Sequence, residues 1–193
     1  MYLDRVLYPV TALGPGKRAV IWTSGCDRHC PGCADPELWD RHPEQAISVE
    51  RLTEILVSLS ARGIDGITLT GGEPFDQAQE LAALLDALPF AADVTAFSGY
   101  TLEQLQEDPV RMVLLERIDV LIDGPYIESQ NDGIAPMRGS VNQRIHYLAP
   151  AVRPMYEAYL SKGRQIENFI YDYKTVSVGI HVPGRAVGRE NDA

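Results

Sequence analysis

Residues 19–33 read AVIWTSGCDRHCPGC, and this stretch sets the expectation for the whole fold. Ala19 to Thr23 is a short run, rich in β-branched residues, of the kind that forms a buried strand. It leads directly into a loop, Ser24 to Cys33, that holds all three cysteines of the chain. A strand followed at once by a chemically unusual loop is the unit that the rest of the sequence repeats.

The same unit occurs three more times along the chain. Gly66–Thr70 is followed by Gly71-Gly72-Glu73-Pro74, Val94–Phe97 by Ser98-Gly99-Tyr100, and Ile118–Ile122 by Asp123-Gly124-Pro125. Helical patterns fill the gaps, over 49–62 after the N-cap Ser48, over 75–88, and over 101–116 in two pieces that begin at Thr101 and Pro109. Strand, loop and helix in this order predict parallel strands joined by right-handed crossovers.

Four such units are too few for a closed eight-stranded barrel, which typically takes about 250 residues. We therefore expect an α/β fold, a partial, open parallel β/α barrel, over residues 1–150, with β-like stretches at 2–10 and 17–23. Residues 151–193 should form a small C-terminal extension, with a helix at 155–160, a hairpin from 166–173 and 175–182 around Lys174, and a frayed end at 184–193. In parallel α/β folds the loops after the carboxyl ends of the strands build the site, so the four loops should lie together.

Composition restricts the partners and the compartment. Seventeen Lys and Arg against twenty-seven Asp and Glu give a formal net charge of −10, which argues against a general affinity for nucleic acid or an anionic membrane. No apolar run approaches the roughly 18 residues that span a bilayer, and Met1 to Arg5 does not resemble a signal peptide. Three cysteines in one window are a poor disulfide framework, so the expected location is the reducing cytoplasm.

Cys26, Cys30 and Cys33 have the spacing C-x3-C-x2-C, with no fourth cysteine in the chain. Thiolates bind both zinc and iron–sulfur clusters, so spacing and number must decide between them. Structural zinc sites usually join two loops that are distant in sequence, whereas three thiolates from one eight-residue loop suit a four-iron cluster. A zinc site completed by His29 or His42 is one alternative, and a set of inert thiols is another.

Three protein thiolates would leave one iron of a four-iron cluster without a cysteine ligand. Proteins that only pass electrons normally supply four cysteines, so an open iron favours binding of a substrate or cofactor. Gly25 and Gly32 allow the backbone to wrap closely around the metal. With all three cysteines used in this way, no second cluster could be bound by thiolates.

The cysteine loop, followed by GGEP after the next strand, resembles the radical S-adenosylmethionine (SAM) superfamily. Within it, the chain is similar to the activating proteins of anaerobic ribonucleotide reductase over about residues 10–148. The matching pieces are Gly14–Arg18, Gly25–Cys33, Asp35–Trp39, Phe97–Tyr100, Asp123–Tyr126 and Arg138–Arg144. The last piece points to this activase branch, whereas residues 150–193 extend beyond its compact members.

The resemblance implies a SAM site beside a 4Fe-4S cluster held by the three cysteines, which would then be both metal ligands and catalytic residues. The open iron would chelate the amino and carboxylate groups of SAM. Gly71 and Gly72 would offer bare backbone to the methionine portion, and Glu73, followed by Pro74, would accept from its ammonium group. The alternative for this motif is a strand-to-helix turn in which Glu73 only favours the helix dipole.

Three further residues are assigned to cofactor binding by the same resemblance, each with a structural alternative. Ser98 would reach the ribose or the carboxylate of SAM, or else cap the following helix. Asp123 would orient SAM or a bound cation, or else form a turn. Arg138 would touch SAM or the partner, or else lie in a solvated loop. Tyr100, like the other large aromatic residues, is interpreted as packing rather than as a stacking platform.

The function that the resemblance implies is enzymatic. The protein would cleave SAM to methionine and a 5′-deoxyadenosyl radical, which would abstract hydrogen from a glycine Cα of a glycyl-radical enzyme such as anaerobic ribonucleotide reductase. A flavodoxin- or ferredoxin-type protein would donate the electron. The alternatives are a radical SAM enzyme that acts on a peptide or small molecule, and a non-enzyme, either an iron–sulfur electron carrier or a zinc-binding scaffold.

Overall fold

The structure is a computed structural model that describes residues 1–171 and 174–180. Its strands are β1 (Leu3–Val10), β2 (Arg18–Thr23), β3 (Gly66–Gly71), β4 (Asp93–Phe97), β5 (Val120–Asp123), β6 (Arg144–Tyr147), β7 (Ile166–Tyr171) and β8 (Lys174–Gly179). Its α-helices are α1 (Val49–Ser60), α2 (Ala78–Ala87), α3 (Leu102–Glu107), α4 (Pro109–Leu115) and α5 (Arg153–Leu160). The strands and helices that the sequence predicts are confirmed, with small differences at their ends.

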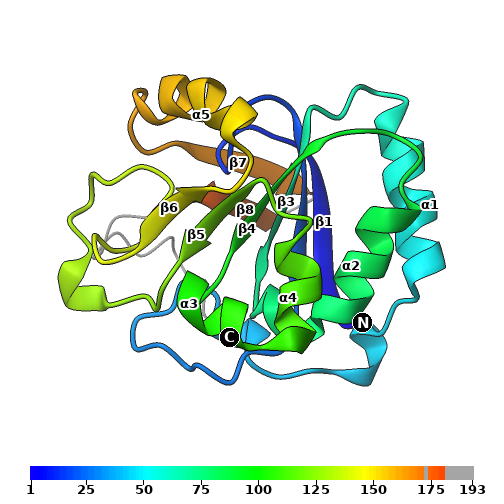
Figure 1. The fold of residues 1–193 in the computed structure, drawn as a ribbon, viewed down its shortest axis with the longest axis horizontal. Helices are drawn as coiled ribbons and strands as arrows, with labels where there is room; N and C mark the ends of the chain where they lie inside the picture. The colour runs from blue at the N-terminus through cyan, green and yellow to red at the C-terminus, as the bar shows by residue number, and fades with distance from the viewer. Residues whose placement is uncertain (172–173, 181–193) are drawn as a thin grey trace.

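Six strands form one mixed sheet in the order β1-β2-β3-β4-β5-β6 (Figure 1). Strands β2 to β5 run parallel to one another, whereas β1 and β6 pair antiparallel at the two edges. Strands β7 and β8 form a separate antiparallel pair, which confirms the hairpin in the C-terminal part. Residues 172–173 and 181–182 of that hairpin, and the expected frayed end at 184–193, lie outside the described residues.

The expected partial parallel β/α barrel is wrong, because the connections at both edges of the sheet carry no crossover helix. Residues 11–17 join β1 to β2 by a tight turn in which Gly14 and Gly16 take φ values of +136° and +76°, so the chain reverses direction. Between β5 and β6 there is only a 3₁₀ turn, Glu128–Gln130, and β6 returns antiparallel. Parallel neighbours need a long crossover, so only the four central strands are parallel and the sheet stays open.

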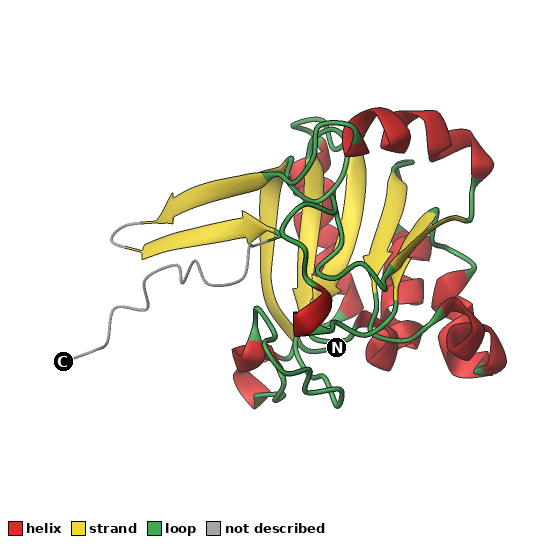
Figure 2. Ribbon diagram, turned by 90° about the vertical axis from the view of Figure 1, so that its left-hand side faces the viewer, coloured by secondary structure: helices red, strands yellow, loops and turns green. Residues whose placement is uncertain are grey.

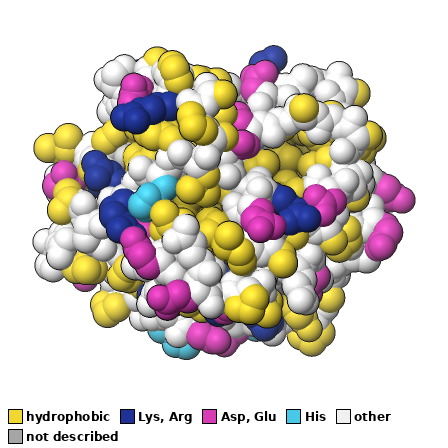
Figure 3. Space-filling view, in the orientation of Figure 1, with side chains coloured by type: hydrophobic (Ala, Val, Ile, Leu, Met, Phe, Trp, Pro, Cys, Tyr) yellow, Lys and Arg dark blue, Asp and Glu magenta, His cyan; other side chains and the backbone are white. Residues whose placement is uncertain are grey.

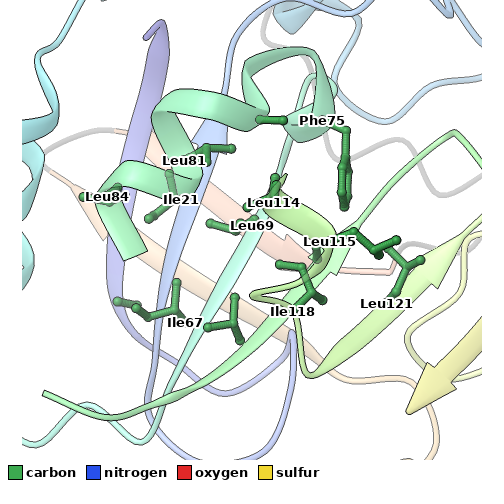
Figure 4. Packing of buried hydrophobic residues seen from close by; sticks show 14 of the residues in the cluster. Ile21, Ile67, Leu69, Phe75, Leu81, Leu84, Leu114, Leu115, Ile118 and Leu121 are labelled. Carbon is green, nitrogen blue, oxygen red and sulfur yellow. The ribbon is translucent and has the colours of Figure 1, made fainter. Parts of the chain in front are cut away.

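Helices α1, α2 and α4 cover one face of the sheet (Figure 1). The residues of the parallel strands that point to this face are apolar, and α2 and α4 bring leucines to meet them (Figure 4). Figure 4 labels Ile21, Ile67, Leu69, Phe75, Leu81, Leu84, Leu114, Leu115, Ile118 and Leu121 of this cluster. Hydrophobic burial of this layer fixes the crossovers and thereby the positions of the loops that follow each strand.

The C-terminal extension covers the opposite face of the sheet, and Figure 2 shows the β7–β8 hairpin projecting from one side of the sheet. Val178 of β8 packs in one cluster with Trp22 of β2. Tyr156 and Tyr159 of α5 pack in another with Ile122 of β5. Because both faces are covered, β2 is buried along its whole length, as is usual for parallel strands. The division of the chain at residue 150 stays a prediction.

A buried arginine lies at the end of the sheet opposite the candidate site. Arg18, at the start of β2, has no exposed surface, and its guanidinium donates to Thr68 and Thr95 and pairs with Asp93 at 3.0 Å. The hydroxyl group of Tyr156 bonds to Thr95 and Asp93, so α5 completes this network. The buried charge is therefore paired and fully hydrogen-bonded, as burial requires.

The surface is mixed in charge. Acidic and basic side chains are interspersed over the face seen in Figure 3. Among the described residues, no helix combines the length and the apolar character needed to cross a membrane.

Candidate functional site

The loops that follow β2, β3, β4 and β5 meet at the carboxyl edge of the parallel strands, as the sequence predicts. The backbone N–H of Glu73 donates to Gly25 O at 2.9 Å, which joins the GGEP loop to the cysteine loop. The carboxylate of Glu73 accepts from Gly99 N at 2.7 Å, and Gly124 N donates to Tyr100 O at 2.9 Å. Hydrogen bonds thus connect all four loops into one structure.

The three cysteines share one curled loop at this edge, seen in blue along the lower edge of Figure 1. Cys26, Cys30 and Cys33 are free thiols, each partly exposed. Cys33 N donates to Cys30 O at 3.1 Å, and positive φ values at His29 (42°) and Gly32 (73°) turn the chain around. Burial raises the pKa of Cys26 and of Cys33, so metal binding would release protons from these thiols.

The segment after the cysteines anchors the start of their loop. Gly25 N donates to Leu38 O at 2.8 Å, and Cys26 N donates to Trp39 O at 2.9 Å. The side chain of Leu38 is buried among apolar residues of β1 and β2, so this segment is itself held by the core. The ring of His29 lies against Trp39, with 4.7 Å between their centroids. The backbone of Cys26, at the start of the loop, is therefore held in place by the segment that follows the last cysteine.

Two glycines hold the GGEP loop against the cysteine loop. A Cβ atom on Gly72 would lie 2.4 Å from Gly25 O, and one on Gly71, whose φ is +100°, would lie 2.5 Å from the backbone of Thr23. No real Cβ comes so close to backbone atoms, so the two loops can touch only because both residues lack a side chain. Both glycines keep some exposed surface at this junction.

Glu73 lies buried under the junction, with only 1% of its surface exposed. Its carboxylate accepts from Phe75 N at 3.1 Å, from Ser98 Oγ at 3.0 Å and from Gly99 N at 2.7 Å. Burial raises the pKa of Glu73 to about 7, although these three donors act to lower it. Pro74, at the first position of the 3₁₀ turn Pro74–Gln77, is buried beside it. The structure thus brings Glu73, Pro74 and Ser98 together, with Glu73 linking the loops after β3 and β4.

Asp123 is also buried, and protein donors already surround its carboxylate. It accepts from Leu102 N at 2.7 Å and pairs with Arg144 at 2.5 Å and with His146 at 3.1 Å. Burial acts to raise the pKa of Asp123, but Arg144, Leu102 N and His146 together hold it below its usual range. Asp123 therefore links β5, β6 and the start of α3.

Arg138 lies in the loop before β6, where its neighbours belong to its own loop and to the C-terminal extension. Its Nη1 donates to Gln143 O at 3.3 Å, and its own carbonyl accepts from Arg164 at 3.0 Å. These contacts connect Arg138 to the outer wall of the site and not to the GGEP junction.

A cavity of about 380 Å³ opens beside Cys30. Arg28, Tyr100 and Tyr126 contribute to its lining. The guanidinium carbon of Arg28 lies 4.7 Å from the centre of the Tyr100 ring, and its Nε is buried without a hydrogen-bond partner in the described part of the chain. Arg28 had no predicted role, and Tyr100, which was expected to pack, both packs against the apolar core and lines this cavity. An arginine between two cysteines was the available signal.

A second arginine fixes the position of Tyr100. The guanidinium carbon of Arg111 lies 4.1 Å from the ring centre, and Arg111 pairs with Asp76 at 3.1 Å. The hydroxyl group of Tyr100 donates to Asp76 at 2.8 Å. Burial raises the pKa of Tyr100 to about 12, with Asp76 adding to the effect. The wall of the cavity is thus rigid and its tyrosine stays neutral.

The donors at this edge fit a four-iron cluster. In residues 1–171 and 174–180, no three His, Cys, Asp or Glu side chains converge on the position of a single ion. A cubane cluster does not need that arrangement, because each thiolate binds a different iron atom. The Nε1 of Trp39, buried beside the loop without a hydrogen-bond partner among the described residues, offers a donor of the kind that cluster sulfurs accept.

Known proteins share this chain's iron–sulfur region. Residues 12–146 match the family model described as a 4Fe-4S single cluster domain. The chain is 32% identical over 149 residues to the anaerobic ribonucleoside-triphosphate reductase-activating protein of Salmonella typhimurium, an alignment covering 73% of this chain and 96% of that protein. The proteins of the same name from Vibrio cholerae and from phage T4 are 34% and 32% identical, over 72% and 75% of this chain and 94% and 93% of their own lengths.

The fold and the site, together with the match over residues 12–146, define a protein with a single 4Fe-4S cluster domain. The chain belongs to the family of anaerobic ribonucleoside-triphosphate reductase-activating proteins. The resemblance found in the sequence is thereby confirmed.

Proposed function

We propose that this protein is a radical SAM enzyme that generates a glycyl radical on a partner enzyme of the anaerobic ribonucleotide reductase kind. The observation that carries the proposal is the single loop of three free thiols, held at the carboxyl edge of the sheet beside a cavity. The names of the relatives support the choice of partner. Cys26, Cys30 and Cys33 are the proposed cluster ligands.

The proposed chemistry needs one protein-free iron. When bound, the cluster would supply that iron to chelate SAM, and one electron to cleave its sulfonium into methionine and a 5′-deoxyadenosyl radical. The electron would come from a flavodoxin- or ferredoxin-type donor. The protein's own task is to bind SAM, orient it and exclude water.

The residues around the cavity are suited to that task. The guanidinium of Arg28 can form a bidentate pair with the carboxylate of SAM, because its Nε lacks a protein acceptor in the described chain. Tyr100 and Tyr126 supply aromatic walls. The exposed backbone of Gly71 and Gly72 lies at the junction where the methionine portion would rest.

The remaining candidate residues would act mainly by position. The carboxylate of Glu73, through Ser98, ties the GGEP loop to the loop after β4, and the backbone N–H of Glu73 ties it to the cysteine loop. Asp123 holds the start of α3, and Arg138 stands on the wall that a partner protein would approach.

The test is anaerobic reconstitution with iron and sulfide, followed by dithionite and SAM. We expect a brown protein that forms 5′-deoxyadenosine and methionine only when the reductant is present. The Cys30→Ala variant should lose both the cluster absorbance and the cleavage, and Asp132→Ala, altered on an exposed loop, should keep both. Cleavage retained by Cys30→Ala would contradict the cluster assignment.

Two measurements separate the alternatives. Mixing the reduced protein with SAM and the candidate reductase should give the doublet of a glycyl radical in its electron paramagnetic resonance spectrum. SAM cleavage without that doublet would favour a peptide or small-molecule substrate. A colourless protein that holds one zinc, or a cluster unaffected by SAM, would favour the scaffold or the electron carrier.

A further inference from the structure

Trp39 has the contacts of a residue that belongs to the cysteine loop, although it follows the last cysteine by six positions. Its carbonyl accepts from Cys26 N at 2.9 Å, and its ring lies against His29, between the first and second cysteines. The neighbouring Leu38 is buried in the apolar core, so the position of the indole is set by the fold and not by the loop alone. The indole is thus held firmly against the loop.

The N–H group of this indole has no protein acceptor within the described residues. Nε1 is buried, yet it makes no hydrogen bond there. A tryptophan N–H that is buried usually finds a partner, because removal from water without one is unfavourable. The cysteine loop lies beside the indole. Once its thiolates bind an iron–sulfur cluster, the sulfur atoms of the loop and the cluster can accept a hydrogen bond from this N–H group.

The sulfur atoms of a bound cluster are the acceptors that this position favours. The indole ring lies against His29, between the first and second cysteines, and the Trp39 carbonyl accepts from Cys26 N. Its buried N–H therefore lies beside the loop that would carry the cluster, whose sulfur atoms accept hydrogen bonds.

We propose that Trp39 donates a hydrogen bond from Nε1–H to a sulfur of the cluster or of its cysteine ligands in the cluster-loaded protein, and that it is a positioning residue that raises the reduction potential of the cluster. Hydrogen bonds to cluster sulfurs stabilise the reduced, more negative form. The stack on His29 and the bond to Cys26 keep the donor in place in both oxidation states. The inference rests on the cysteine loop as the cluster site of the proposed function and does not require that SAM is cleaved.

The chain provides a matched control, because it contains only one other tryptophan, Trp22. Trp22 lies on β2 and packs with Val178 of the C-terminal hairpin, and the guanidinium carbon of Arg5 lies 5.3 Å from the centre of its ring. Trp39→Phe removes the N–H and keeps an aromatic ring against His29, and Trp22→Phe makes the same change elsewhere. Iron content and the midpoint potential are measured on both reconstituted variants and on the parent protein, without SAM.

We expect Trp39→Phe to retain its iron and to be about tenfold harder to reduce, which for one electron is a decrease of about 59 mV. Trp22→Phe should keep the parent potential. An unchanged potential in Trp39→Phe, or an equal decrease in both variants, overturns the inference. If the parent protein binds no iron after reconstitution, that result would instead refute the proposed function itself.

A second measurement covers the case in which Trp39→Phe fails to assemble. In Trp22→Phe, Trp39 is the only tryptophan, so indole-¹⁵N labelling marks one nitrogen in the whole chain. Pulsed electron paramagnetic resonance of the reduced cluster should then detect coupling to that nitrogen. Absence of the coupling overturns the inference.

Discussion

Replacing Gly72 by alanine tests whether backbone contact between the GGEP loop and the cysteine loop holds the site together. The φ of Gly72 lies outside the left-handed region, so alanine brings no conformational strain of its own. Its Cβ would lie 2.4 Å from Gly25 O, 2.9 Å from Gly25 C and 3.1 Å from Gly25 N. These are backbone atoms at the entrance to the cysteine loop, and they cannot rotate away.

The loss of unfolding free energy in Gly72→Ala can be worked out from the overlap between the alanine Cβ and the backbone of Gly25. An ordinary contact begins at 3.4 Å, so the two loops must separate by about 1 Å. The hydrogen bond from Glu73 N to Gly25 O, now 2.9 Å, would lengthen to about 3.9 Å and be lost. Overpacking costs about 1–3 kcal/mol and the lost bond about 1 kcal/mol, which gives about 2–4 kcal/mol of unfolding free energy. For a chain of this size the melting temperature should fall by roughly 4–16 °C.

The assay is thermal and urea unfolding of the cluster-free protein, together with iron uptake on reconstitution. Gly99→Ala is the matched control, because its φ also lies outside the left-handed region and its only close Cβ contact would be with the flexible side chain of Arg28, at 2.3 Å, while Glu73 Oε2 lies at an ordinary 3.5 Å. We expect Gly72→Ala to lose both stability and iron uptake, and Gly99→Ala to lose little stability. Equal stability of the two variants would refute the argument that the loops touch backbone to backbone.

Three further outcomes follow from the buried groups. Tyr156→Phe should lower the unfolding free energy by about 1–3 kcal/mol in urea titrations, because it removes the hydroxyl that bonds to Asp93 and Thr95; an unchanged midpoint contradicts this. Since the pKa of Glu73 is about 7 when folded and near 4.5 when unfolded, the folded state binds more protons between these values. Stability of the cluster-free protein should therefore fall from pH 5 to 8, by up to about 3 kcal/mol relative to Glu73→Gln, and a rise would refute the shift. Arg28→Gln should weaken SAM binding about tenfold or more by calorimetry, and an equal loss for decarboxylated SAM would exclude a carboxylate contact.

The sequence predicted the parts of the site that depend on neighbours along the chain. The run Ala19–Thr23 and the three later apolar runs became β2 to β5, because alternation and β-branching act within a few residues. The shared edge for their loops followed, since parallel strands place their carboxyl ends together. The cysteine spacing likewise needed no knowledge of distant residues.

Roles that depend on distant partners were harder to predict. GGEP was expected to present Glu73 to a ligand, but the loops after β4 and β3 supply three donors that bury its carboxylate. Asp123 similarly receives Arg144 and His146 from β6, a strand that the sequence pattern did not predict. Apart from Phe75, none of these partners lies close to its carboxylate in sequence.

The sequence by itself determined the order of strands and helices, the three thiols in one loop and the family to which the chain is similar. Tertiary structure decided that the outer strands run antiparallel, that the C-terminal extension covers the sheet, that Arg28 lines the cavity, and that Trp39 packs against the cysteine loop. The physical reason is the separation along the sequence over which each interaction acts. Periodicity, capping and ligand spacing operate over a few residues. Strand direction and buried polar partners depend on contacts between segments far apart in the chain.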